Sequence, residues 1–363
     1  MIFAYNNFMG GIYMSKIRRM FPGGNTANGF YSFHGNIIWG DRKKLYILKG
    51  MPGGGKSSLM KEVGKKALEK GFSLEYHHCP SDPNSIDGIH IEELKVAIVD
   101  GTAPHIIDPI YPGLEDQLID LGIFIDSSKL YKNKEKIYRG KLNNKIAYSR
   151  AYNYFKAARI IYDIIVENNK NGMDYTAVNR ESLNLMKSIF YEKNGRIKES
   201  KIRHMFAAAN TPDGYVDFSH TILEDLTKIY YIEGHIGTGK STLLKRIIEM
   251  GEIKGYSMEI YHNPTMPEKI ETIIIRELNM AITSNKKAMN FSHEKINLNK
   301  YLDIEIINDS DYKIYGNLIK EGIGNLKLAK ENHKILEESY KTSIDYRGVD
   351  QIKKKIIEEI FIY

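Results

Sequence analysis

Two short stretches of the chain have the residue types and spacing of a phosphate-binding loop. The first is GMPGGGKSS, residues 50–58, and the second is GHIGTGKST, residues 234–242; both follow the pattern G-x-x-x-x-G-K-S. Glycines let the backbone turn tightly and direct N–H groups at a phosphate, and the N-terminus of a following helix also favours anions. The lysine reaches the β- and γ-phosphates, and the serine hydroxyl ligates Mg²⁺. The pattern therefore predicts two sites for a nucleoside triphosphate, taken here as ATP, with Mg²⁺.

The residues expected to bind the nucleotide lie within these two loops. They are Gly50, Gly53, Gly54, Gly55, Lys56, Ser57 and Ser58 in the first loop, and Gly234, Gly237, Thr238, Gly239, Lys240, Ser241 and Thr242 in the second. Ser57 and Ser241 are the expected metal ligands of the loops, and Lys56 is an expected catalytic residue. The alternative is an accidental glycine-rich turn, which the extended segment before each loop and the helical pattern after it disfavour.

A carboxylate at the end of a buried strand normally completes the Mg²⁺ shell of such a site. Asp100 ends the apolar run KVAIVDG, and we predict that it is both a metal ligand and a catalytic residue; the alternative is a turn residue beside Gly101. The second copy has Ser284 at the aligned position, and a hydroxyl cannot replace the charge of a carboxylate. The chemistry is therefore expected at the first loop, and the second is expected to handle metal or hydrolysis less well.

Two further pairs of charged residues occupy aligned positions in the two copies. Glu93 and Glu277 could supply a general base or an alternative metal contact, but a charged hairpin turn between two short strands is the favoured interpretation. Arg18 and Arg203, in the repeated KIR, could reach the γ-phosphate of the other half; exposed arginines that pair with surface acids are the alternative.

The stretch HHC, residues 77–79, lies at the expected C-terminal end of a strand, where α/β sheets bind ligands. His78 aligns with His262, but Cys79 aligns with Asn263. No second Cys/His pair at ligand spacing accompanies it, so packing or substrate contact is favoured over a metal site. His105, just beyond Asp100, could sense phosphate or belong to the loop structure.

The sequence around the loops is also repeated, so the elements that position them occur twice. Four blocks recur in the same order: residues 16–33 match 201–218, the glycine loops match each other, residues 74–98 match 258–282, and residues 173–190 match 344–361. This order predicts a tandem duplication over nearly the whole chain. We expect a first repeat at 15–197 and a second at 198–363, with the boundary in the polar segment 193–200. Residues 1–14 are interpreted as a disordered or wrongly assigned N-terminal tail.

Each copy has the same expected order of elements. An extended segment runs into the glycine loop, an amphipathic helix follows, and a second strand leads to a turn that is rich in Pro and Asp in the first copy. A third apolar segment and a helical tail complete the copy. Strands that alternate with helices predict an α/β fold: two tandem three-layer domains with parallel sheets, each followed by a helical tail.

Composition limits the class of protein. The 363 residues are 42% hydrophobic and 27% charged, as in a soluble globular protein. The single cysteine, Cys79, excludes an intrachain disulfide framework and fits a cytoplasmic location. No apolar run is long enough to predict a membrane span. The net charge of +7 permits contact with nucleic acid, but the densest basic run, residues 129–145, is typical of a solvated helix face.

The two glycine loops resemble the Walker A motifs of the P-loop NTPase superfamily. Together with AIVDGTAPH and the paired segments NTANG and NTPDG, they resemble an uncharacterised bacterial family of tandem (double) P-loop ATPase-like proteins. The resemblance covers most of the chain and implies nucleotide binding and a three-layer α/β fold. It supplies no substrate, because only the P-loops carry assigned chemistry.

Three functions are compatible with these observations. The first is Mg-dependent ATP hydrolysis, or a switch driven by it, in which the halves pack as an intramolecular dimer. The second is a nucleotide or small-metabolite kinase, with the helical tails as lid and arginines such as Arg139, Arg150 and Arg159 available to it. The third is a non-enzymatic, nucleotide-dependent binding or regulatory module, whose partner would be an unknown protein or small molecule. Ser284 and the absence of a glutamate directly after Asp100 favour the third.

Overall fold

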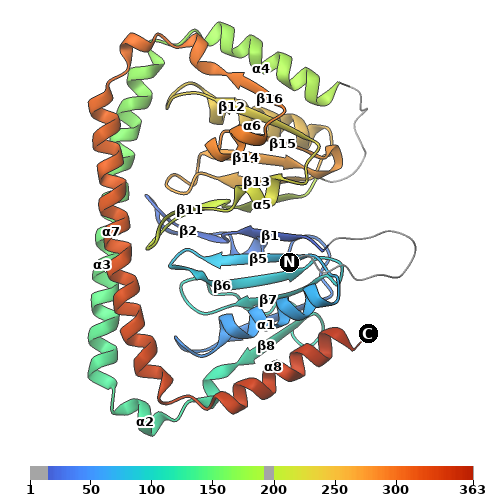
Figure 1. Ribbon diagram of the computed structural model, residues 1–363, viewed down its shortest axis with the longest axis vertical. Coiled ribbons are helices and arrows are strands. Elements are labelled where there is room, and N and C mark those ends of the chain that lie inside the picture. Colours follow the sequence, from blue (N-terminus) through green and yellow to red (C-terminus); the bar gives the residue numbers. More distant parts are fainter. Residues whose placement is uncertain (1–14, 192–199, 363) are drawn as a thin grey trace.

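The computed structural model describes residues 15–191 and 200–362, which form two six-stranded sheets stacked one above the other (Figure 1). The expected N-terminal tail and most of the repeat boundary lie outside these residues. The strands and helices of the first repeat are β1 (Ile17–Met20), β2 (Gly23–Thr26), β3 (Gly29–Ser32), β4 (Lys44–Lys49), α1 (Lys56–Glu69), β5 (Leu74–Cys79), β6 (Asp82–Ile91), β7 (Val96–Asp100), β8 (Asp116–Asp120), α2 (Ser127–Tyr131), α3 (Lys134–Lys170) and α4 (Tyr175–Phe190). Those of the second are β9 (Ile202–Met205), β10 (Ala208–Thr211), β11 (Gly214–Asp217), α5 (Ser219–Leu223), β12 (Lys228–Glu233), α6 (Lys240–Ile253), β13 (Met258–His262), β14 (Ile270–Ile275), β15 (Met280–Thr283), β16 (Glu294–Asn297), α7 (Asp309–Lys341) and α8 (Tyr346–Phe361).

The two sheets have the same strand order. The first is β1-β5-β6-β7-β4-β8 and the second is β9-β13-β14-β15-β12-β16. In each sheet the strand before the glycine loop, β4 or β12, pairs in parallel with β7 or β15. Asp100 is the last residue of β7, and its aligned residue Ser284 directly follows β15. The sheet therefore brings the end of the third apolar segment next to the glycine loop in both repeats.

The prediction of parallel sheets is correct only in part, because both sheets are mixed. Strand β6 runs antiparallel to both β5 and β7, and β14 runs antiparallel to β13 and β15. Short connections join these strands along the chain, and a short connection can join only antiparallel neighbours. The remaining strand pairs of the two sheets are parallel.

The segment expected as a Pro- and Asp-rich turn in the first repeat is largely strand β6. Asp82, Ile86 and Gly88–Ile91 pair with β5, and Gly88–Ile91 also pair with β7. Pairing with β5 outweighs the weak strand propensity of DPNSIDG.

Each sheet is covered by helices on one face and by a core shared with the other sheet on the opposite face. On β4, Tyr46 and Leu48 pack in the core under α1, whereas Leu45 and Ile47 belong to the shared core. The shared core also contains residues of the second repeat, such as Ile229 on β12. The chain is therefore layered as helices, sheet, shared core, sheet and helices, and the shared core includes Ile222 and Leu223 of the short helix α5. The arrangement is consistent with two tandem domains that adjoin through this core.

The helical tails exchange partners between the repeats. Helix α3 leaves the first repeat and runs beside α7, so that α4 lies on the second sheet and α8 lies on the first (Figure 1). Val178, Leu185 and Ile189 of α4 are buried in the core of the second repeat. Ile356 and Ile360 of α8 are buried in the core of the first. We call α3–α4 and α7–α8 the arms of the two repeats.

Backbone hydrogen bonds hold the junction between the two helices of each arm. Before α8, the N–H of Asp345 donates to the carbonyl of Phe124 (2.9 Å), and before α4, the N–H of Asp174 donates to the carbonyl of Tyr301 (2.9 Å). The side chains of Asp345 and Asp174 then cap the first turns of α8 and α4. The same capping residue at aligned positions directs each short helix onto the sheet of the other repeat.

The exchange of arms predicts which repeat is destabilised locally by a cavity in an arm. Ile356→Ala and Leu185→Ala remove aligned, buried side chains from α8 and α4, and each should destabilise the chain by about 2–5 kcal/mol. Hydrogen exchange should accelerate in α1 and β4–β8 for Ile356→Ala, but in α6 and β12–β16 for Leu185→Ala. Faster exchange within the mutated helix's own repeat would contradict the exchange of arms.

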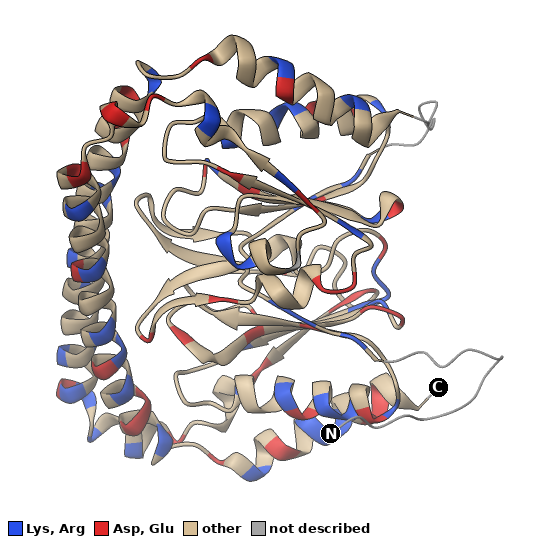
Figure 2. Cartoon of the chain, turned by 45° about the horizontal axis from the view of Figure 1, so that its top comes forward, with Lys and Arg blue, Asp and Glu red and all other residues tan. Residues whose placement is uncertain are grey.

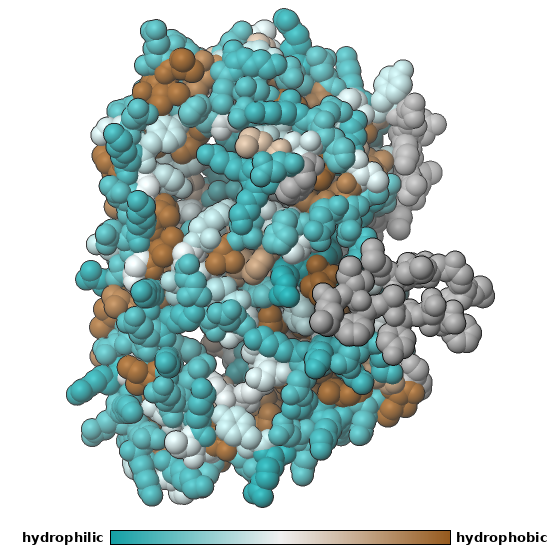
Figure 3. Space-filling model, in the orientation of Figure 1, coloured by the Kyte–Doolittle hydropathy of each residue, from teal (hydrophilic) through white to brown (hydrophobic). Residues whose placement is uncertain are grey.

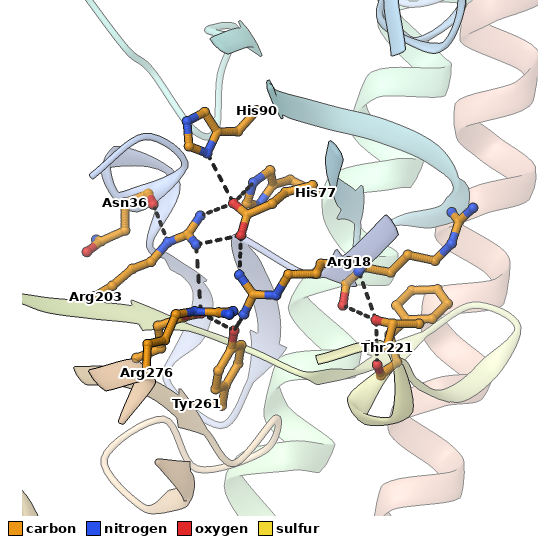
Figure 4. Close-up of polar contacts among 12 residues, drawn as sticks. Arg18, Asn36, His77, His90, Arg203, Thr221, Tyr261 and Arg276 are labelled. Carbon is orange, nitrogen blue, oxygen red and sulfur yellow. Dashed lines mark hydrogen bonds and ion pairs between the residues drawn. The ribbon is translucent and has the colours of Figure 1, made fainter. Parts of the chain in front are cut away.

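A buried ion cluster joins the two sheets where their edge strands β1 and β9 and the neighbouring strands β5 and β13 meet (Figure 4). Arg18 on β1 pairs with Glu75 on β5 and with Glu259 on β13 of the other repeat. Arg203 on β9 donates to both carboxylate oxygens of Glu75, at 2.9 and 2.7 Å. Arg276 also pairs with Glu259. The attraction within these ion pairs offsets the cost of burying the charges. Because the pairs cross from one repeat to the other, they also hold the two sheets together.

The outer surface is mostly polar. The face shown in Figure 3 is largely hydrophilic with scattered apolar side chains. Lys and Arg are interspersed with Asp and Glu along the paired long helices (Figure 2). Most residues of the basic run at 129–145 are exposed. Within the described residues, no helix combines the length and the apolar character that a membrane crossing needs.

Candidate functional site

The first glycine loop connects β4 to α1 at one edge of the first sheet. Gly53 and Gly55 have φ of 71° and 87°, in the left-handed region that glycine adopts without strain. A Cβ atom on Gly54 would lie 2.5 Å from Sδ of Met51, so this position has no room for a side chain. Helix α1 begins at Lys56, directly after the loop. The expected order of strand, loop and helix is confirmed.

The side chain of Lys56 lies over its own loop and next to Asp100. Its Nζ donates to the carbonyl of Met51 at 3.0 Å and lies 3.5 Å from Oδ2 of Asp100. Strand β7 ends at Asp100 beside β4, so the sheet itself brings the two residues together. The other carboxylate oxygen, Oδ1, accepts from the N–H of Thr102 at 2.9 Å, so Asp100 also shapes the turn after its strand.

The second loop has the same backbone form. Gly237 and Gly239 have φ of 86° and 92°, and Nζ of Lys240 donates to the carbonyls of Gly234 and His235, both at 2.6 Å. The serines that follow the two lysines also correspond. Oγ of Ser57 accepts from the N–H of Ile86 at 3.0 Å, and Oγ of Ser241 accepts from that of Ile270 at 3.2 Å. The two loops are thus two copies of one local structure.

An acid that sequence reasoning missed lies near Lys240. Ser284 has no carboxylate, and its Oγ donates to the carbonyl of Glu271 on β14 at 3.3 Å. Burial and the nearby Asp217 raise the pKa of Glu271 to about 7, and burial lowers the pKa of Lys240 to about 8, an effect that Glu271 opposes. Glu271 aligns with Asp87 in the gapless block of the two repeats, and this pair of acids was the available signal.

The arm of the opposite repeat contacts each loop. Oη of Tyr346 on α8 donates to the carbonyl of Gly53 at 2.9 Å, and Oη of Tyr175 on α4 donates to that of Gly237 at 3.3 Å. Nδ2 of Asn169 on α3 also donates to the carbonyl of Ile236 at 2.7 Å. Each glycine loop is therefore held by the helices of the other repeat.

The paired charges predicted from the repeats do not reach the loops. The side chains of Arg18 and Arg203 are only 8% and 1% exposed and belong to the ion cluster, so both the γ-phosphate role and the exposed position are wrong. Glu93 accepts from the N–H of Ser73 at 2.9 Å, and Glu277 accepts from that of Ser257 at 3.1 Å. Their interpretation as hairpin-turn acids is confirmed.

The HHC stretch packs inside the fold. His78 is buried, its Nδ1 donates to the carbonyl of Pro83 at 2.7 Å, and burial lowers its pKa to about 4. His262 has the equivalent bond to Pro267 and a pKa lowered by burial to about 4. Burial likewise raises the pKa of the Cys79 thiol. These contacts favour the packing interpretation of the stretch.

His105 lies behind Asp100. Its Nδ1 donates to the Asp100 carbonyl at 2.9 Å, and its ring stacks on that of His34 with 4.2 Å between the ring centroids. Sequence reasoning did not single out His34. His34 directly follows the first repeated block, and Ser219 takes its place in the second repeat.

Comparisons of the chain with protein-family models, with curated proteins and with solved structures gave no match.

Proposed function

We propose that the protein binds ATP with Mg²⁺ at its two glycine loops and hydrolyses it slowly, with the chemistry at the first loop. The observation that carries this proposal is the juxtaposition of Lys56 and Asp100 at the end of paired strands, 3.5 Å apart. In a phosphate site of this type, the lysine neutralises the transferring phosphate and the acid holds the metal shell.

The residues at the first loop fit Mg²⁺. Ser57 and Asp100 offer a hydroxyl and a carboxylate oxygen, which are the hard donors that Mg²⁺ prefers. Bound Mg²⁺ would neutralise charge on the β- and γ-phosphates. The positive φ of Gly53 and Gly55 and the lack of room at Gly54 fit a backbone that closely approaches a phosphate.

The contacts of the arms favour a switch over a simple hydrolase. Each loop is bonded to the arm of the other repeat, and the arms pack together along α3 and α7. A nucleotide that changed the form of one loop would also shift a helix that belongs to the arm of the other repeat. Coupling of the two sites through this two-armed element is therefore part of the proposal.

The alternatives are less well supported. For a kinase, two of the arginines considered for a lid have other partners: Arg150 donates to Asn325 at 3.0 Å, and Arg159 pairs with Glu268 at 2.7 Å. A regulatory binder without turnover is the second candidate, because Ser284 leaves the second loop without an acid at the position of Asp100.

The test is phosphate release by the purified full chain with Mg-ATP and no acceptor. We expect slow release that chelation of Mg²⁺ abolishes and that Asp100→Asn reduces at least about tenfold. Asp108→Asn, which removes an exposed acid that pairs with Lys49, is the matched control and should retain the wild-type rate. ADP formation only when a nucleoside monophosphate is added would indicate a kinase, and ATP binding without turnover would indicate a regulatory module.

A further inference from the structure

We propose that His34, Asp87 and His105 bind one divalent transition-metal ion behind the first glycine loop. They come from three separate segments: a short 3-10 helix (His34–Asn36), strand β6 and the loop that follows β7. All three are buried, with 3, 4 and 9% of their surface exposed. Within the described residues, they are the group of three whose candidate ligand atoms all lie within 4.8 Å of one another.

The spacing of the donor atoms fits a single ion. Nε2 of His34 lies 3.3 Å and Nε2 of His105 lies 3.9 Å from Oδ2 of Asp87. Ligands at about 2.1 Å from a tetrahedral ion are about 3.4 Å apart, a spacing close to that of these donor atoms. The two imidazole rings are stacked with 16° between their planes, so they would have to rotate to direct both Nε2 atoms at one ion.

The outer hydrogen bonds engage the ring nitrogens that face away from Asp87. Nδ1 of His105 must donate to the Asp100 carbonyl, because a carbonyl can only accept. Nε2 of neutral His105 then carries a lone pair that faces the carboxylate of Asp87. A cation between this nitrogen and the carboxylate would remove their repulsion. Oγ of Ser32 lies 2.9 Å from Nδ1 of His34, and Nε2 of His34 forms a hydrogen bond with Asp87 that a metal ion would replace. Such outer partners fix the orientation of metal-binding histidines.

The donor set determines the class of metal. Two imidazoles and one carboxylate suit zinc, ferrous iron or cobalt, whereas Mg²⁺ and Ca²⁺ prefer oxygen donors. Three protein ligands also leave a position open for water. The second repeat lacks the set, because Ser219 stands where His34 stands in the first, although Glu271 keeps a carboxylate at the position of Asp87.

The bond from His105 to Asp100 connects this metal site to the glycine loop, but the proposal does not depend on nucleotide binding. A metal there would hold the loop after β7 against β6 and so fix the backbone of Asp100. Failure to bind ATP would leave the metal site intact, and failure to bind metal would leave the proposed function open.

The test is titration of metal-free full chain with Co²⁺, followed by its visible absorption, and then displacement with Zn²⁺. We expect one saturable Co²⁺ per chain, in the presence of excess Mg²⁺, and a higher melting temperature with Zn²⁺. His34→Gln and His105→Gln should each weaken Co²⁺ binding at least about tenfold. His204→Gln, which removes a histidine from the His204–His262 pair of the second repeat, is the matched control and should bind Co²⁺ as the wild type does.

Circular dichroism of the metal-free variants establishes that they are folded. If they are not, the wild type alone decides: no saturable binding of Co²⁺ would overturn the proposal and would make the cluster a buried group of histidines paired with Asp87. Equal Co²⁺ affinity in the wild type and in folded His34→Gln would also overturn it.

Discussion

Lys56→Ala is expected to slow phosphate release from Mg-ATP by about 100-fold or more. The magnitude is that of removing one preorganised charged donor from a site where negative charge develops. Nζ of Lys56 is held between its loop carbonyls and Asp100, so it is already placed where phosphates would enter. Phosphate release under saturating ATP measures the effect.

The aligned substitution Lys240→Ala is the matched control, because it removes the same side chain from the same local structure. We expect a smaller loss of rate, since the second loop has Ser284 in place of Asp100. Equal losses in the two variants would contradict the assignment of the chemistry to the first loop. In that case Glu271, close to Lys240, would be the acid to replace next.

Glu75→Gln is expected to lower the free energy of unfolding by about 3–5 kcal/mol, because it leaves Arg18 and Arg203 buried with one carboxylate fewer. Glutamine keeps the size of the side chain, so the loss reports the charge. Urea denaturation measures it. Glu62→Gln removes an acid that is 53% exposed and paired with Lys353, and it should change stability by less than about 1 kcal/mol.

The same ion cluster determines how the stability of the folded protein changes as the pH falls. Although burial alone would raise the pKa of Glu259, the charges of Arg18, Arg276 and Arg203 lower it from 4.5 to about 2. Burial also opposes ionisation of Glu75, yet Arg203 and Arg18 hold its pKa well below the usual value. Stability from these carboxylates is therefore complete above about pH 4.5 and is lost as the pH falls toward about 2. The stability difference between the wild type and Glu75→Gln should narrow over that range; a constant difference would contradict the assignment.

The sequence predicts the local parts of the site because they depend on neighbouring residues. Glycine spacing determines the loop, and the apolar run before Asp100 places it at the end of a strand beside β4. The arms could not be predicted in this way. Val349 and Ile356 show that α8 has an apolar face, but the aligned α4 has the same face, so the pattern cannot identify which sheet each helix covers.

The buried arginines are hidden for a related reason. Arg18 meets Glu75 across 57 residues and Glu259 across 241 residues, and no local pattern distinguishes a charge buried by such partners from an exposed one. Asp87 and Glu271 could have been found from the sequence, because the alignment of the repeats places an acid at this position in both. The segment that carries Asp87 was predicted to be a turn, so the burial of Asp87 was not predicted.

The exchange of arms also determines the order in which the protein can be completed during synthesis. The first repeat emerges from the ribosome long before α8, whose Ile356 and Ile360 belong to the core over the first sheet. Until α8 has been made, only α1 covers that apolar face, and the core lacks the side chains that α8 contributes. The first glycine loop likewise lacks Tyr346, its contact on α8. The half of the chain that is translated first is therefore the half that is finished last, and a chain that stopped before α8 would leave it incomplete.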